Sequence, residues 1–235
     1  MGPRPRLSGR MSSAVALNLS PSLVRVDLHM HSSASFDCEI EPERVAARCR
    51  RLGLGPVFLT DHDTIQGAVR LQELGSARVV VGEEVMTSEG ELIGLFLAGE
   101  IRSGLTPAKA AAEIKSHGGL VYLEHPYDHS RRHLSEEGIE SVADLIDIVE
   151  VFNGRSDENA NRMAEELRGT LGAAPGAGSD AHTLDEIGSV YVELEEFEGA
   201  EDFLRKLRLS TIVKNRNKLF LAAEALSRSA LRWRN

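Results

Sequence analysis

Metal-binding side chains follow at least five predicted strands of this 235-residue chain, and no other feature constrains its fold as strongly. The groups come directly after strand-like or glycine-rich runs: DLHMH at 27–31, TDHD at 60–63, GEE at 82–84, EHP at 124–126 and SDAH at 179–182. Residues two apart on a strand face the same side, so His29 and His31 can bind one ion together. Imidazole and carboxylate are common ligands of Zn, Mn and Fe. The sequence therefore predicts an enzyme that holds several metal ions.

Strand-like and helix-like segments alternate along the chain, which favours a parallel sheet. We expect strands at 24–26, 57–60, 79–81, 120–123, 146–152 and 190–194, a hairpin over 85–97, and helices at 42–52, 64–74, 106–117, 156–171 and 200–207. An open sheet concentrates its site at one switch point, whereas a barrel gathers residues from many strand ends. Because the candidate ligands follow so many strands, we predict a closed α/β barrel.

The composition is that of an ordinary globular protein, with 42% hydrophobic and 27% charged residues. No apolar run approaches the roughly 20 residues needed to cross a bilayer, so we expect no membrane partner. The net charge of −9 gives the molecule no general attraction for nucleic acid. The two cysteines, Cys38 and Cys49, make no disulfide framework, and this favours a cytoplasmic location.

We divide the chain into three segments. Residues 1–22, rich in Arg, Ser, Pro and Gly, are predicted to be a disordered leader, and residues 23–213 to form the barrel domain. Residues 214–235 are expected to be a basic C-terminal helix or tail. In this tail only Glu224 opposes Lys214, Arg216, Lys218, Arg228, Arg232 and Arg234. A solvated helix face is preferred there to a nucleic-acid or membrane patch.

Taken in order, the motifs at 27–31, 60–63, 124–126 and 179–182 resemble those of the PHP (polymerase and histidinol phosphatase) family of metal-dependent phosphoesterases. The resemblance extends from about Val24 to Leu207. A lone His-x-His is weak evidence, since amidohydrolases also have one, but four motifs in order are specific. The resemblance implies a distorted (β/α)7 barrel, with the metal site at the C-terminal ends of the strands.

The resemblance also implies three divalent transition-metal ions and their ligands. The first ion would be bound by His29, His31 and Asp180, the second by His125 and the bridging Glu84, and the third by Asp37, His62 and His182. Glu91 stands where the family commonly has a second-ion histidine. Five imidazoles and four carboxylates favour Mn, Fe or Zn over Mg, without deciding among the three.

Several of these assignments have alternatives. Glu91 is a departure from the family pattern, and it could be a solvated hairpin residue. Asp37 could cap the loop before the helix at 42–52. Glu84 competes with its neighbour Glu83, and we prefer Glu84 because of its spacing from Gly82.

Other polar residues near the motifs are assigned supporting roles. We expect Asp27 and Asp61 to orient imidazoles rather than to bind metal. His117 is expected to cap the C-terminus of its helix, where positive charge is favoured. His129 and His133 are expected to be exposed loop residues.

The predicted reaction is hydrolysis of a phosphate ester by a metal-bridging hydroxide. Metal ions lower the pKa of bound water from about 15.7 to about 7, and no serine or cysteine nucleophile motif is present. Arg155 resembles the arginine of an Asn-Gly-Arg segment at the family's cleft rim and could clamp a phosphate, although a surface salt bridge explains it almost as well. Asp180 and His182 are the candidate proton acceptors.

The preferred substrate is a small phosphorylated metabolite or a nucleotide, with inorganic phosphate as product. Nucleic acid is expected only as an oligonucleotide end cut by a nuclease-like activity. Aromatic residues near the motifs are few, and Phe36, Tyr127 and Phe152 identify no base-stacking platform. An amidohydrolase-like C–N hydrolase fits the motif order less well. A non-catalytic module would be expected to have lost ligands.

Overall fold

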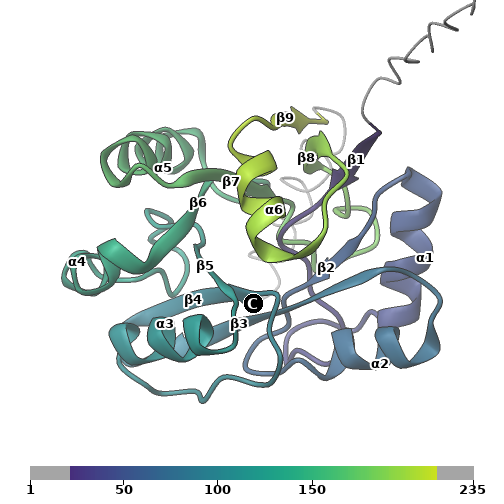
Figure 1. Cartoon of the computed structure of the whole chain (residues 1–235), viewed down its shortest axis with the longest axis horizontal. Helices are drawn as coiled ribbons and strands as arrows, with labels where there is room; N and C mark the ends of the chain where they lie inside the picture. The colour runs from purple at the N-terminus through teal and green to yellow at the C-terminus, as the bar shows by residue number, and fades with distance from the viewer. Residues whose placement is uncertain (1–21, 216–235) are drawn as a thin grey trace, which may run out of the picture.

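The computed structural model describes residues 22–215 (Figure 1). The expected leader therefore lies outside the described residues except for Ser22, and the basic tail except for Lys214 and Asn215. Within the described part of the chain, no helix is long and apolar enough to cross a membrane.

The main sheet has six strands in the order β2-β3-β4-β5-β6-β7. Strand β4 is antiparallel to both of its neighbours, whereas the pairs β2–β3, β5–β6 and β6–β7 are parallel. The bounds are Val57–Leu59 for β2, Val79–Thr87 for β3, Gly90–Leu95 for β4, Leu120–Leu123 for β5, Ile146–Asn153 for β6 and Ala174–Gly178 for β7.

The stretch 27–31 joins the two edges of this curled sheet. On the β7 side, the amide of Leu28 donates to the carbonyl of Ala177 at 3.4 Å. On the β2 side, the amide of Thr60 donates to the carbonyl of Met30 at 3.0 Å. The stretch thus acts as a seventh strand, and the prediction of a distorted (β/α)7 barrel is confirmed.

A second, antiparallel sheet lies beside the barrel and has the order β1-β8-β9. Its strands are β1 (Leu23–Val26), β8 (Val190–Glu195) and β9 (Thr211–Lys214), and helix α6 (Gly199–Leu207) lies next to it (Figure 1). The rings of Phe58, Phe197 and Phe203 pack together between this layer and the barrel. Strand β1 runs directly into the stretch 27–31, so one length of chain belongs to both sheets.

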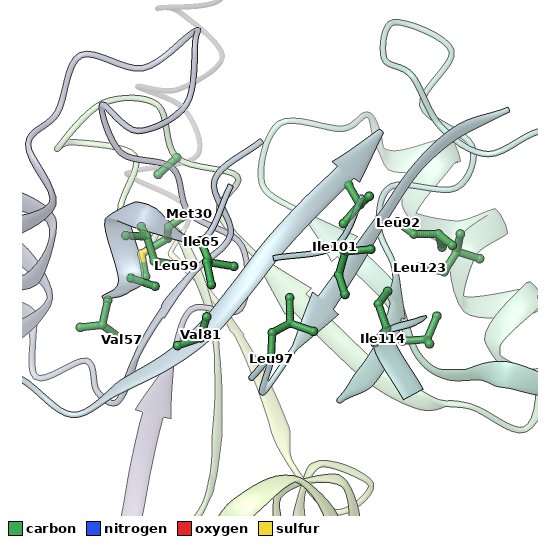
Figure 2. Packing of buried hydrophobic residues seen from close by; sticks show 14 of the residues in the cluster. Met30, Val57, Leu59, Ile65, Val81, Leu92, Leu97, Ile101, Ile114 and Leu123 are labelled. Carbon is green, nitrogen blue, oxygen red and sulfur yellow. The ribbon is translucent and has the colours of Figure 1, made fainter. Parts of the chain in front are cut away.

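Helices lie around the outside of the barrel (Figure 1). They are α1 (Pro42–Leu52), α2 (Gln66–Leu74), α3 (Pro107–Ser116), α4 (Glu136–Val142) and α5 (Glu158–Leu171), and a 3-10 turn at Ala143–Leu145 follows α4. Figure 2 shows Ile114 of α3 against Leu92 and Leu123 of the sheet, and all three side chains are fully buried. Each such side chain contributes about 1.5–3 kcal/mol by leaving water.

The predicted elements are present, with two informative differences. Helix α2 begins at Gln66 rather than 64, because Asp63 has a left-handed backbone (φ 51°) and its carboxylate accepts the amide of Met86 at 2.8 Å. Strand β7 was missed because its sequence, APGAG, has little strand propensity. A Cβ at Gly178 would lie 2.4 Å from the Cβ of His29, so the small residues serve tertiary packing.

Helix α4 and strand β9 were also not predicted. The N-cap of α4 is Ser135, whose hydroxyl accepts the amide of Gly138 at 3.0 Å. Strand β9 is short and half-exposed, and its pairing with β8 gives it its extended form. Neither segment has the strong periodicity that identified the other elements.

Candidate metal centre

All the side chains that the sequence predicts as metal ligands lie together at one end of the barrel, where its parallel strands finish. Their ligand atoms form overlapping groups, and within each group the atoms lie within 4.8 Å of one another. The side chains are His29, His31, Asp37, His62, Glu84, Glu91, His125, Asp180 and His182.

Glu84 of β3 lies at the middle of this cluster and contacts four imidazoles. Its Oε2 is 3.1 Å from Nε2 of His29 and 3.2 Å from Nε2 of His31. The same oxygen is 3.5 Å from Nδ1 of His62, and Oε1 is 3.3 Å from Nε2 of His125. One carboxylate is therefore in reach of side chains assigned to all three ions.

Asp180, which follows β7, faces the two histidines of the stretch 27–31. Its Oδ1 lies 3.8 Å from Nε2 of His29 and 3.5 Å from Nε2 of His31. Its Oδ2 accepts hydrogen bonds from Arg131 and from Asn153. Burial raises the pKa of Asp180, but Arg131 and the imidazoles lower it more, so its pKa lies well below the usual range. This carboxyl is held in its ionised form, which suits a metal ligand.

Glu91 lies on the same face of the β3–β4 hairpin as Glu84. It pairs with Met86, and residues two apart on a strand share a face. Its Oε1 is 3.5 Å from Nδ1 of His62, and the residue is only 5% exposed. The alternative of a solvated hairpin residue is therefore wrong. Burial and the charge of Glu84 raise the pKa of Glu91 to about 7.

Asp37 joins the group nearest to solvent. Its Oδ2 is 3.0 Å from Nε2 of His182 and 3.4 Å from Nε2 of His62, and a ligand atom of His31 completes the group. The contacts of the Asp37 carboxylate are with these two rings, and Glu41 rather than Asp37 is the N-cap of helix α1, which favours the ligand role over the loop-capping alternative. Burial raises the pKa of Asp37, but His182 and His62 lower it more, and the net pKa is below the ordinary value.

The donor atoms of this cluster fit divalent metal ions. A buried polar atom without a partner is costly, and such atoms are normally hydrogen-bonded. Here several buried nitrogen and oxygen atoms have no hydrogen bond: His31 Nε2, His62 Nδ1, His125 Nδ1, Glu124 Oε1 and Asp180 Oδ1. Divalent cations bound among these side chains would supply partners for such atoms. Imidazole together with carboxylate suits Mn, Fe and Zn.

Glu150 of β6 contacts the ring nitrogen of His29 that points away from Glu84, and this role was not predicted from the sequence. It is fully buried, and its Oε1 lies 3.2 Å from Nδ1 of His29 and accepts the hydroxyl of Tyr122 at 2.9 Å. Its Oε2 accepts the amide of His125 at 3.0 Å. A carboxylate behind a ligating histidine fixes the orientation of the ring. A lone charge inside the apolar strand 148–152 was the available signal.

The roles expected of Asp27 and Asp61 need correction. Asp27 does not contact an imidazole but accepts the backbone amides of Ser179 and Gly188, at 2.8 and 2.9 Å. Asp61 accepts the hydroxyl of Ser35 at 3.1 Å, and that hydroxyl lies 3.3 Å from Nδ1 of His31. Asp27 thus holds backbone in place, Asp61 acts on a ring only through a serine, and Glu150 orients the ring of His29.

A pocket of about 250 Å³ opens over the cluster. Besides ligand side chains it is lined by Phe36, Arg131, Arg132 and Arg155. The NH1 of Arg155 lies 2.8 Å from Nδ1 of His182, and its Nε is 3.5 Å from Glu186. Arg155 is therefore a pocket residue rather than a surface one. Arg131 was not predicted, because only the fold brings its loop to Asp180.

The remaining histidines are outside the cluster. His117 is the C-cap of α3, as predicted. His129 is exposed, also as predicted, whereas His133 is half-buried and its Nδ1 lies 3.0 Å from the carbonyl of Asp128. His133 is, as predicted, a loop residue outside the candidate ligands, but it is half-buried rather than exposed, because its ring contacts its own loop.

Residues 27–172 match the family model described as PHP domain, and residues 158–212 match one described as PHP-associated. An uncharacterized protein of Methanocaldococcus jannaschii is 32% identical over 201 residues, which cover 80% of this chain and 81% of that protein. Another from the same organism is 37% identical over 144 residues, 55% of this chain and 82% of that protein.

Solved structures of low sequence identity share the fold. A two-domain protein from Bacteroides vulgatus, containing a predicted PHP-like metal-dependent phosphoesterase, has a TM-score of 0.67 and 17% identity, covering 86% of this chain and 70% of that one. The lesion-specific endonuclease EndoQ from Pyrococcus furiosus has a TM-score of 0.62 and 15% identity, covering 81% of this chain and 58% of that one.

Proposed function

The chain belongs to the PHP domain family, and we propose that it is a metal-dependent phosphoesterase acting on a small phosphorylated metabolite or a nucleotide. One observation carries the proposal. Imidazoles, carboxylates and arginines converge on a single pocket of about 250 Å³. Ligands for cations and guanidinium groups for an anion, in one pocket, suit a substrate that carries a phosphoryl group.

We assign the metal ligands as the resemblance to the PHP family implies. His29, His31 and Asp180 would hold one ion, and Glu84 with His125 and Glu91 a second. Asp37, His62 and His182, whose ligand atoms form one group with that of His31, would hold a third. Divalent ions in these positions, with Mn, Zn and Fe as candidates, would neutralise charge on phosphoryl oxygens and lower the pKa of water.

The chain's own residues would bind and orient the phosphoryl group. Arg155 has its amide held by the side chain of Asn153 at 2.8 Å, and a guanidinium can bind two phosphate oxygens at once. Arg155 donates to Nδ1 of His182 at 2.8 Å, and this contact positions both side chains at the pocket. Arg131 keeps the pKa of Asp180 low, and this favours a role for Asp180 in binding a cation rather than a proton.

An oligonucleotide end is the second candidate substrate, and Phe36 is the observation that favours it. The Phe36 ring stacks on the His62 ring with centroids 5.0 Å apart, yet the residue is 81% exposed at the pocket. An exposed aromatic face can stack on a base. Phe36 would thus serve as a platform that the sequence did not identify, and it would serve a mononucleotide equally well.

Metal-depleted protein reloaded with Mn²⁺, Zn²⁺ or Fe²⁺ and assayed on phosphate monoesters and diesters tests the proposal. We expect hydrolysis that a chelator abolishes, and that His29→Ala and Asp180→Ala lose while remaining folded. Elemental analysis should find more than one ion per chain. A reloaded protein with no hydrolysis of any ester, or variants with activity within a few-fold of the parent, would contradict the proposal.

A further inference from the structure

Two glutamates of the barrel are buried with one carboxylate oxygen that has no partner. Glu83 in β3 and Glu124, directly after β5, are both 0% exposed. The Oε2 of Glu83 accepts the amide of Ile101 at 2.8 Å, and the Oε2 of Glu124 accepts the amide of Ile93 at 3.0 Å. In each, Oε1 makes no hydrogen bond. An ionised carboxylate in such a place needs a cation nearby.

Only one of the two has a metal ligand set within reach. Ligand atoms of Glu124, Glu84 and His125 lie within 4.8 Å of one another. Glu83 belongs to no such group among residues 22–215. Glu83 precedes Glu84 in a regular strand, so the two side chains point to opposite faces and Glu83 faces away from the cluster.

The backbone at His125 explains why Glu124 does not face away as Glu83 does. Strand β5 ends at Leu123, and His125 has a positive φ of 27°. A left-handed residue interrupts the alternation of an extended strand, so adjacent side chains can approach the same point. Such a conformation is costly for a residue with a Cβ, and backbone strain of this kind gathers at functional sites.

We propose that Glu124 is a further ligand of the cation held by Glu84 and His125. The proposal rests on the metal centre of the proposed function. It gives that position two carboxylates and one imidazole before Glu91 contributes. The position then favours a hard, oxygen-preferring cation such as Mn²⁺ over Zn²⁺.

Glu124→Gln and Glu83→Gln form a matched pair that tests this. Each replaces a wholly buried carboxyl by a neutral group of the same size. If Glu124 is a ligand, Glu124→Gln should bind one Mn²⁺ equivalent about 10–100-fold more weakly than the parent, with a smaller loss for Zn²⁺. Glu83→Gln should bind both ions as the parent does. Free Mn²⁺ is counted by electron paramagnetic resonance, and total metal by elemental analysis after equilibrium dialysis.

The outcomes distinguish a protein that has no metal centre from one in which Glu124 is not a ligand of it. A parent that binds neither Mn²⁺ nor Zn²⁺ overturns the proposed function and this inference together. A parent that binds Mn²⁺, with Glu124→Gln unchanged, overturns the inference alone, since Glu124 is then a neutral structural acid. Equal losses in both variants also overturn it. If Glu124→Gln does not fold, Glu124→Asp replaces it, because a ligand drawn back by one methylene should still weaken Mn²⁺ binding.

Discussion

The two ends of the metal centre differ in donor chemistry and in exposure. At one end His31, His62 and His182 surround Asp37, whose side chain is 34% exposed. At the other end carboxylates outnumber imidazoles, and the side chains are buried: Glu84, Glu91, Glu124 and His125. Imidazole suits Zn, Cu and Fe, whereas carboxylate suits harder ions such as Mn. The difference teaches that one centre can have positions of unlike metal preference and unlike exchange with solvent.

The largest effect is expected at the residue that joins the two ends. Glu84→Gln should remove a ligand shared by the groups containing His29, His62 and His125. Hydrolysis should fall by about 10³-fold or more, since metal polarisation contributes several kcal/mol to the rate. Turnover and metal content, measured with saturating Mn²⁺, check this. If only one ion were lost and the rate fell a few-fold, the two ends would be independent sites.

The second prediction concerns the acid-rich end. Glu91→Ala should raise the Mn²⁺ concentration for half-maximal rate by about 10-fold or more, as loss of a site's ligand requires. Glu91→His should keep activity and shift the preference from Mn²⁺ towards Zn²⁺, because a neutral nitrogen replaces a charged oxygen. Metal-activation curves of the three proteins at one pH decide this. Identical curves would show that Glu91 is not a ligand.

A smaller change is expected at the exposed, imidazole-rich end. Asp37→Asn should weaken binding of one ion by about 10-fold. The loss of Mn²⁺ affinity should exceed the loss of Zn²⁺ affinity by less than it does in variants of the acid-rich end. Glu39→Gln, an exposed carboxylate two residues away, is the control and should bind metal as the parent does. Calorimetric titration of both variants measures this. A Mn²⁺-over-Zn²⁺ difference larger than that of the variants at the acid-rich end would contradict the assignment of the two ends.

The smallest effect concerns stability without metal. Burial and Glu84 raise the pKa of Glu91 from 4.5 to about 7, so the folded state binds the proton more tightly than the unfolded state. The contribution of Glu91 to the stability of the metal-free parent therefore falls as the pH rises from about 4.5 to about 7. Glu91→Gln should raise the free energy of unfolding by about 1–2 kcal/mol at pH 8 and hardly at all at pH 5. Urea titrations at both pH values check this. Equal gains at both would point to packing rather than charge.

Several candidate ligands could be located from the sequence because they lie where strands end, and strand ends meet in a barrel; Glu84, Glu91 and Asp37 were assigned from the family resemblance instead. His29 and His31 are an example, since strand alternation alone places both rings on one side. Arg131 could not be found this way, because its position depends on the path of the loop that follows β5. Glu124 and Glu83 show the limit most clearly. Each follows a run of apolar strand residues, but β3 continues through Glu83, whereas β5 ends before Glu124 and His125 has a left-handed backbone.

A closed barrel could be predicted from the sequence, but the stretch of chain that closes it could not. Alternating strands and helices identified β2, β5 and β6, since hydrophobic strand signals bounded by turns are strong there. The role of residues 27–31 as the seventh strand depends on hydrogen bonds to Ala177 and Thr60, which are distant in sequence. Strand β7 was hidden for the same reason, because its glycines are selected by contact with His29 and Tyr122.

The position of the stretch 27–31 between the two edges of the main sheet has a consequence for how the protein is made. The amide of His31 donates to the carbonyl of Ala181, and the amide of Asp180 donates to the carbonyl of His29. A ribosome produces the histidines some 150 residues before it produces these partners. Contacts of such long sequence separation form late and slowly. The growing chain therefore carries its first candidate metal ligands before the residues that complete their site, and the full group can form only after the last barrel strand has left the ribosome.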